Sequence, residues 1–486
     1  MDFDKEQEPI IRRWRCFAKR PSITVMMVAV SFCFIIILCA FSFSGLGNKS
    51  QAAKRFYAHK VTFSTKTPYK YEENTDVVVE KPEGCRATQL NMVFRHGTRY
   101  PSENDIIKID KMLGVLKSFQ HNEEFVKALS KLNVTLENPY KVNLEKDLTT
   151  VGDNELYNIG KRYQQRFPEL LESNFRVNEF KFKSTCKARS SQSAYAFALG
   201  FLEGHGSIGN DKVQPVPIEI NPCNNDSSLR YYDLCTKYQK RVEDNDTALI
   251  EETKFMSGKE VDGVVKKVKA YLQLQKEKNV TSAEVKMMYL LCAFAIGILD
   301  QNINNGWCKL FDGEDYDVME YILDLKSYYK RSSAYKITYE SSCPLLREIL
   351  NFMKAKSEKS SESELFRGIF RSSHAETVIP LYALMGLLVD ERHLLASNYN
   401  EMKNREFKGS RIAPFAGNLA IVLYECTNNT HKVQLYNNEK LMKLPCCKSS
   451  IDCPFEEFRR CYEKIATDCN LKSLCNVNST ATHDEL

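Results

Sequence analysis

Three short β-prone segments, each of which runs into a polar loop, limit most strongly what this chain can fold into. Residues 89–94 and 180–184 place apolar side chains at alternate positions, as half-buried strands do, and strand character returns at 365–371. The second and third segments lead through their loops into apolar helices. Strands that alternate with helices in this way predict a wound α/β sheet. Reactive residues in such a sheet usually lie in the loops at the strand ends.

An almost unbroken apolar run, residues 23–43, follows the basic cluster between Arg12 and Arg20. Its length matches the roughly twenty residues that cross a bilayer, and the order of charge predicts a cytosolic N-terminus and a lumenal remainder. The run exceeds a typical signal-peptide core, which favours an uncleaved anchor, but Ser42-Phe43-Ser44 also offers a cleavage site. The final residues, His483 to Leu486, match an endoplasmic reticulum retrieval signal. The expected location is therefore the lumen of the endoplasmic reticulum, with the retrieval receptor as a partner.

Fourteen cysteines follow the apolar run, an even number that predicts disulfides in an oxidising compartment. A zinc site is the alternative for the tail cluster between Cys446 and Cys475. That cluster has neither C-x-x-C spacing nor an interleaved histidine, so disulfides are favoured. Sequons predict exposed glycosylation sites at Asn48, Asn133, Asn225, Asn245, Asn279, Asn428 and Asn478.

The length of the chain, 486 residues, exceeds what one core usually supports, so more than one subdomain is expected. Between residues 223 and 330 the pattern changes to amphipathic helices, notably at 282–299 and 316–329, and a closing hairpin follows at 418–436. The predicted fold class is α/β, a wound central sheet with helices on both faces plus an inserted, mainly helical domain. The predicted segments are a cytosolic tail (1–21), a signal anchor or signal peptide (22–44), a lumenal stalk or irregular wrap (45–84), the first part of the α/β domain (85–222), the helical insertion (223–330), the second part of the α/β domain (331–440) and a cysteine-rich tail (441–486).

The overall charge excludes one class of partner. A formal net charge of +6, of which the first twenty residues carry +2, is too small and too scattered for a nucleic-acid-binding surface. An anionic small molecule needs only a local positive pocket, which net charge does not reveal. The expected partners are therefore a small anionic substrate and, if the apolar run is not cleaved, a membrane.

The most reactive string follows the first predicted strand and reads Arg95-His96-Gly97-Thr98-Arg99-Tyr100-Pro101. Two guanidiniums beside an imidazole oppose its protonation, which lowers the pKa of the imidazole and leaves a ring nitrogen free to act as base or nucleophile. Arginine also presents forked donors that match phosphate oxygens. From these residue types alone, a basic surface turn is an equally good interpretation.

The whole string resembles the R-H-G-x-R-x-P signature of the histidine acid phosphatases. Leu148-Thr149-x-x-Gly152 and Ser184-Thr185-x-x-x-Arg189 resemble two further landmarks of that family, and the resemblance covers about residues 85–436. It implies an α/β domain with a helical insert and a phosphohistidine intermediate that needs no metal or other cofactor. It also implies His96 as the nucleophile, with phosphoryl oxygens bound by Arg95, Arg99, Arg189 and His374.

His374-Ala375-Glu376 departs from the His-Asp pair of most of the family and resembles the variant of its multiple inositol polyphosphate phosphatases. The resemblance implies hydrolysis of phytate and lower inositol phosphates, with 2,3-bisphosphoglycerate as a further substrate, and Glu376 as the acid that protonates the leaving oxygen. From the residues alone, His374 fits a packed core histidine, and Glu376 fits a first-turn acid that interacts with the helix dipole. Lys187 is a weak candidate for a further phosphate contact, because a solvated surface lysine is the better interpretation.

Two other functions stay open at this point. The first is a general histidine acid phosphatase, which the His-Ala-Glu motif disfavours by analogy with the family. The second is a weakly active lumenal binding protein with the same fold. A protein without catalysis has no chemical need for His96, the arginines and Glu376 together, so a metal-independent phosphomonoesterase is the prediction.

Overall fold

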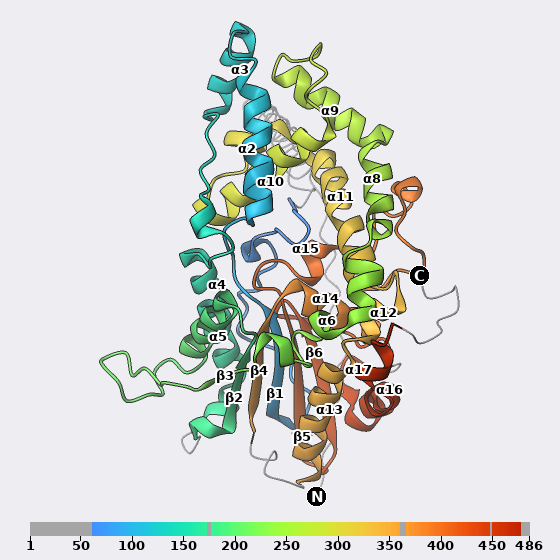
Figure 1. Cartoon of the computed structure of the whole chain (residues 1–486). Helices are drawn as coiled ribbons and strands as arrows, with labels where there is room; N and C mark the ends of the chain where they lie inside the picture. The colour runs from blue at the N-terminus through green and yellow to red at the C-terminus, as the bar shows by residue number, and fades with distance from the viewer. Residues whose placement is uncertain (1–60, 173–175, 360–365, 448–449, 478–486) are drawn as a thin grey trace, which may run out of the picture. The chain divides into compact units, whose positions relative to one another are not determined.

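The computed structural model describes residues 61–172, 176–359, 366–447 and 450–477 (Figure 1). The predicted cytosolic tail and apolar run lie outside the described residues, as do the sequons at Asn48 and Asn478 and the last four residues. Predictions about these segments therefore stay predictions.

One mixed sheet forms the centre of the fold, with the strand order β3-β2-β4-β1-β5-β6-β7 and with β8 paired to β6. Strands β3, β2, β4 and β1 are parallel, whereas the strands from β5 to β8 pair antiparallel. The sheet and the closing hairpin predicted from the sequence are confirmed, with β1 longer than expected. The strands are β1 (Cys85–Arg95), β2 (Phe180–Ser184), β3 (Ile218–Ile220), β4 (Gly368–Ser373), β5 (Asn418–Cys426), β6 (His431–Asn437), β7 (Lys440–Met442) and β8 (Cys453–Pro454).

Helices surround this sheet and form a second, helical region above it in the view of Figure 1. The predicted helix at 282–299 has these bounds in the structure, and the one at 316–329 extends by a few residues at each end. The helices are α2 (Glu103–Lys117), α3 (Glu123–Leu132), α4 (Thr150–Arg166), α5 (Ala188–Phe201), α6 (Tyr231–Leu234), α7 (Thr236–Tyr238), α8 (Ile250–Met256), α9 (Lys259–Tyr271), α10 (Ser282–Leu299), α11 (Gly313–Arg331), α12 (Lys336–Glu340), α13 (Cys343–Glu358), α14 (Ala375–Leu384), α15 (Gly409–Ile412), α16 (Phe455–Thr467) and α17 (Leu471–Leu474).

Both faces of the sheet are covered, as the predicted fold class requires. Successive side chains of a strand point to opposite faces, so Met92 and Phe94 join one hydrophobic core and Val93 joins the other. Helices α4 and α5 close the first core, where Phe197 packs against Phe94 and Phe370. Helices α13 and α14 contact β1 from the second core.

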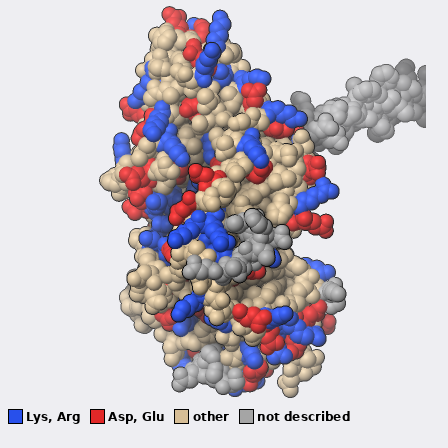
Figure 2. Space-filling model, turned by 45° about the vertical axis from the view of Figure 1, so that its right-hand side comes forward, with Lys and Arg blue, Asp and Glu red and all other residues tan. Residues whose placement is uncertain are grey.

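The helical region draws on more of the chain than the predicted insertion at 223–330. Helix α2, from the first part of the α/β domain, packs against α10, and both bury their apolar residues in the same core. By length and composition, α10 is the one helix among the described residues that could cross a membrane, but 67% of it is buried inside the fold. It is therefore accounted for as a core helix. Figure 2 shows Lys and Arg side chains gathered at mid-height, at the level where the helical region meets the sheet.

The first described residues, 61–72, pack against the fold, and their start contacts α11. Phe63 is fully buried, and the hydroxyls on either side of it donate to buried carboxylates of α11. Thr62 Oγ1 lies 2.7 Å from Glu320 Oε2, and Ser64 Oγ lies 2.6 Å from Asp324 Oδ1. Of the segment predicted as a stalk or irregular wrap (45–84), residues 61–72, called the wrap below, therefore pack against the fold.

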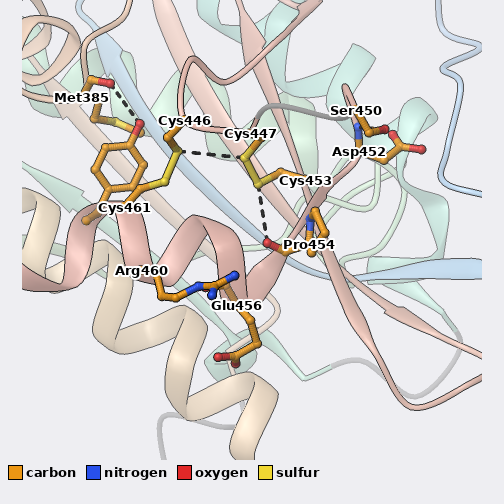
Figure 3. The surroundings of a disulfide bond; sticks show 11 residues. Met385, Cys446, Cys447, Ser450, Asp452, Cys453, Pro454, Glu456, Arg460 and Cys461 are labelled. Carbon is orange, nitrogen blue, oxygen red and sulfur yellow. Dashed lines mark hydrogen bonds between the residues drawn. A yellow bond between two sulfur atoms is a disulfide. The ribbon is translucent and has the colours of Figure 1, made fainter.

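The predicted disulfides are confirmed. The pairs are Cys85–Cys426, Cys186–Cys223, Cys235–Cys475, Cys292–Cys308, Cys343–Cys469, Cys446–Cys461 and Cys447–Cys453. Figure 3 shows the last two pairs side by side, with Cys446 Sγ 3.9 Å from Cys447 Sγ. Cys447, Cys453 and Glu457 lie close enough to share a metal ion, but the two sulfurs are bonded to each other. The zinc alternative for the tail cysteines therefore fails.

Candidate active site

The three loops predicted to carry chemistry meet at the carboxyl edge of the parallel strands. His96 directly follows β1, His374 follows β4, and Arg189 lies in the first turn of α5, after β2. Because β4 lies between β1 and β2, the loops that follow these strands are neighbours. The ring centroids of His96 and His374 are 5.4 Å apart. The structure thus brings together the residues that the motifs single out.

The loop after His96 is held tightly against the first turn of α4. Thr149 is the N-cap residue of this helix: its Oγ1 accepts from Gly152 N (3.1 Å) and donates to Thr98 O (2.8 Å). A Cβ at Gly152 would lie 2.3 Å from Thr98 O, and one at Gly97 would lie 2.3 Å from Gly152 O. Only glycine fits such a close approach of two backbones. The second sequence landmark therefore fixes the position of the reactive loop.

Glu155, one turn further along α4, completes this attachment. Its carboxylate accepts from Thr98 N at 2.7 Å, from Thr98 Oγ1 at 2.9 Å and from Tyr69 N at 3.1 Å. Burial raises the pKa of Glu155, and the hydrogen bonds from Thr98 oppose that rise. Glu155 was not predicted from the sequence, although its position three residues after Gly152 extends the same landmark.

His96 is 3% exposed, and its Nδ1 lies 2.9 Å from Gly97 O. Because a carbonyl oxygen only accepts, this contact assigns the ring hydrogen to Nδ1 and leaves the lone pair on Nε2. Burial, followed by the charge of Arg95, holds the pKa of His96 well below its ordinary value. A neutral imidazole with its free nitrogen in a cationic pocket is suited to attack an anionic phosphorus centre.

Three guanidiniums crowd the same pocket, those of Arg95, Arg99 and Arg189. Their Nε atoms are buried and have no hydrogen-bond partner within the described residues. Burial, and then Arg99, lowers the pKa of Arg95 to about 9, and burial, and then Arg189, lowers that of Arg99 to about 10. The Arg95 guanidinium is held in place by Ala413 O, which lies 3.0 Å from its Nη1. The ring centroid of Phe415 lies 4.4 Å from its Cζ. Buried cations that repel one another are stabilised by an anion placed between them, so the pocket favours a phosphate.

His374 is the N-cap residue of α14 and is 2% exposed. Arg189 NH2 lies 3.4 Å from its Nδ1, and Thr185 Oγ1 lies 2.9 Å from its Nε2. Because a guanidinium only donates, Nδ1 accepts and Nε2 carries the hydrogen that is donated to Thr185. Burial, followed by Arg189, holds the pKa of His374 well below its ordinary value. Thr185 is part of a sequence landmark, but its contact with His374 could not be predicted from the motif.

Glu376 lies in the first turn of α14, and its Oε1 is 2.8 Å from Arg331 NH2, at the end of α11. Burial alone would raise the pKa of Glu376. The charge of Arg331 is the largest of the effects that outweigh burial and hold the pKa well below its ordinary range. In this structure Glu376 is therefore an ionised carboxylate in an ion pair.

Two lysines contrast in their surroundings. Lys66, on the wrap, is half-buried, and burial, and then Arg99, lowers its pKa to about 7, while Asp105 opposes that shift. Lys187 is exposed at the start of α5, in line with the surface interpretation. Sequence reasoning missed Lys66 and Arg331, because neither lies in a motif and tertiary packing alone brings them to the pocket.

A buried neutral histidine at the end of a parallel strand, facing clustered arginines beneath a helical region, defines a class of phosphoryl-transfer site. Residues 87–438 match the histidine phosphatase superfamily (branch 2), and the chain belongs to this family. The predicted resemblance to this family and the predicted fold class are thereby confirmed.

Individual relatives are similar over most of the chain. "Multiple inositol polyphosphate phosphatase 1" of Gallus gallus is 31% identical over 93% of this chain and 98% of its own length. The protein of that name from Homo sapiens is 30% identical over 87% of this chain and 91% of its own length. Among solved structures, the phytase from D. castellii has a TM-score of 0.66 at 18% identity and covers 86% of this chain and 87% of its own. The Bifidobacterium longum multiple inositol polyphosphate phosphatase in complex with inositol hexasulfate has a TM-score of 0.60 at 19% identity, over 84% and 98% of the two chains. These structures share the fold of this chain.

Proposed function

We propose that this chain hydrolyses the phosphate monoesters of inositol polyphosphates, namely phytate and lower inositol phosphates, with 2,3-bisphosphoglycerate as a further substrate. The observation that carries the proposal is the convergence of a neutral, buried His96 with three guanidiniums whose Nε atoms lack partners within the described residues. The names of the relatives that match almost the whole chain support the choice of substrate.

In the first step, His96 Nε2 attacks the phosphorus atom. The Nε2–P bond forms while the bond from phosphorus to the inositol oxygen breaks. Phosphoryl transfer needs mainly positioning and neutralisation of charge on the non-bridging oxygens. Arg95, Arg99 and Arg189 supply both from fixed positions, and His374 lies beside them.

Glu376 has the role of delivering a proton to the departing inositol oxygen, which is a poor leaving group as an alkoxide. Water then attacks the phosphohistidine, the N–P bond breaks, and inorganic phosphate leaves with His96 restored. A covalent intermediate divides one difficult displacement into two easier ones.

The test is an assay of the purified lumenal segment against phytate and a nitrophenyl phosphate, with acid quenching to trap phosphoenzyme. Phytate hydrolysis through an acid-labile phosphoenzyme is the expected result. Turnover of the aryl ester without phytate would instead indicate a general acid phosphatase. Binding of phytate without turnover would indicate the binding protein.

We also propose that the enzyme works in the lumen of the endoplasmic reticulum. The disulfides are typical of an oxidising compartment, and Asn133, Asn225, Asn279 and Asn428 are exposed, with Asn245 half-buried. The apolar run at 23–43 and the sequence from His483 to Leu486 would supply the membrane anchor and the contact with the retrieval receptor. Glycosidase sensitivity of the protein, and its release from endoplasmic reticulum retrieval after removal of the last four residues without loss of specific activity, are the expected results.

A further inference from the structure

The ion pair between Arg331 and Glu376 conflicts with the task proposed for Glu376. A general acid must carry a proton before it can deliver one. Arg331 NH2 lies 2.8 Å from Glu376 Oε1, and a carboxylate held by a guanidinium stays ionised. The free enzyme therefore holds its acid in the form that cannot protonate a leaving group.

Arg331 is nevertheless weakly anchored for a half-buried arginine. Its side chain is 16% exposed, and its Nε is buried without a hydrogen-bond partner within the described residues. It lies at the last residue of α11, and its charge adds to burial and to the other arginines in lowering the pKa of Arg95. Arg331 thus belongs electrostatically to the phosphate pocket and retains capacity for an anion.

The other charged and titratable groups around Glu376 come from every element packed against it. They influence the protonation of Glu376 and lie on the wrap, at the strand ends and in the short helices of the helical region. These groups are Lys66, Arg95, Arg99, Arg189, His374, Tyr231, Tyr232, Asp233 and Tyr238. Arg331 has the largest charge effect on Glu376. A change at Arg331 is therefore the most direct way to change the protonation of the acid.

We propose that Arg331 is a positioning residue that releases Glu376 for protonation only when the substrate carries a second phosphate, an inference that rests on the proposed function. The second phosphate of a bound polyphosphate competes for the Arg331 guanidinium, because phosphate offers more charge and matching forked acceptors. Glu376, freed from the pair, takes up a proton from solvent. It passes that proton to the inositol oxygen as the P–O bond breaks and the bond to His96 Nε2 forms.

A monophosphate substrate engages the guanidiniums around His96 and leaves the Arg331 pair in place. Activity that depends on a protonated acid is lost as the pH rises through the pKa of that acid. For an inositol monophosphate this loss should therefore occur at lower pH than for phytate. Selectivity for polyphosphates would then arise in the protonation of the acid as well as in binding.

The experiment compares Arg331→Met with Lys330→Met, using pH profiles of kcat and KM for phytate and for an inositol monophosphate. Lys330 is the matched control, because it is a buried cation one position earlier that pairs with Glu243 at 3.5 Å and not with Glu376. Arg331→Met should move the alkaline limb for the monophosphate, which is the fall of kcat as the pH rises, to higher pH. At a fixed pH on that limb, kcat should rise about tenfold if the limb moves by about one pH unit. The limb for phytate should stay in place while its KM rises about ten- to a hundredfold for one lost charge-assisted hydrogen bond. Lys330→Met should show neither change.

Several outcomes would overturn the inference. An unmoved monophosphate limb in Arg331→Met, or equal losses for both substrates, would show that Arg331 is only structural. If Arg331→Met does not fold, the wild-type enzyme still tests the inference. Alkaline limbs that coincide for the two substrates would contradict the proposed role of Arg331. Arg331→Lys, which keeps the charge, should restore the low monophosphate limb. A wild-type enzyme that does not hydrolyse phytate would refute the proposed function. Hydrolysis of phytate without the predicted effects of the Arg331 variants would refute the role of Arg331 alone.

Discussion

The sheet edge and the helical region contribute to the site in different ways. The strand ends bring His96, Arg189 and His374 into one pocket, and each of these lies in a short motif. The helical region and the wrap present Arg331 and Lys66, which no motif marks. The groups proposed to face the transferred phosphoryl are thus positioned by local strand and loop geometry. The groups proposed to face the rest of the substrate depend on long-range packing.

Loss of the nucleophile on the sheet side should have the most severe effect. His96→Ala should abolish turnover of every substrate, because the Nε2–P bond cannot form. Labelling with radioactive phosphate under acid quench measures the intermediate and should vanish in this variant. His121→Ala, at an exposed position of the helical region, is the control and should label normally. Undiminished labelling of His96→Ala would remove His96 from the nucleophile role.

Glu376→Gln should affect substrates differently according to how much protonation their leaving group needs. A general acid contributes about 10²–10⁴-fold, so phytate hydrolysis should fall by about that factor. A nitrophenyl phosphate leaves as a stable phenolate and needs little protonation. Its burst of phosphohistidine formation should therefore survive far better than that from phytate. If the first step falls equally for both esters, Glu376 is not the acid, and its first-turn position explains it through the helix dipole.

Arg189→Ala should have a smaller effect that is common to both substrates. Loss of one preorganised donor to a transition-state oxyanion costs about 2.7–4 kcal/mol, which is about 10²–10³ in kcat. Arg189 also contacts His374 Nδ1, so part of the loss will come from a misplaced imidazole. Lys187→Ala, two residues away and exposed, is the control and should retain activity. Activity close to wild type in Arg189→Ala would mean that the third landmark only begins a helix.

The sheet edge could be predicted well from the sequence, because alternation fixes the strands, and motifs fix the loops between them. Thr149 and Gly152 were singled out as one landmark, and the Thr149 hydroxyl accepts from Gly152 N at the start of α4. The partner of Glu376 could not be predicted, since Arg331 reaches it only through the packing of α11 on α14. The packing of the wrap could not be predicted either, because residues 61–72 carry no periodicity and its start is held by buried carboxylates of α11.

A weaker effect, confined to the substrate-facing side, is expected at Lys66. Lys66→Met removes a cation from that side and should raise the KM for phytate about two- to fivefold, the scale of a partly exposed ion pair. Binding of the aryl phosphate, which lacks further phosphates, should not change. An equal loss for both substrates would place Lys66 on the phosphoryl side.

The same substitution should stabilise the protein in a pH-dependent way. The pKa of Lys66 is lowered to about 7 in the fold from an ordinary 10.5, so between these values the unfolded chain binds more protons. Folding stability contributed by this residue therefore rises with pH through that window, and the full cost of charging a crowded lysine applies below pH 7. Lys66→Met removes that cost and should raise the melting temperature at pH 6 on the order of 1 °C, with the gain shrinking as the pH approaches 10. Thermal unfolding at the two pH values measures this difference. A lower melting temperature at pH 6 would show that Lys66 stabilises the wrap, and it would move this residue from the substrate-facing set to the structural one.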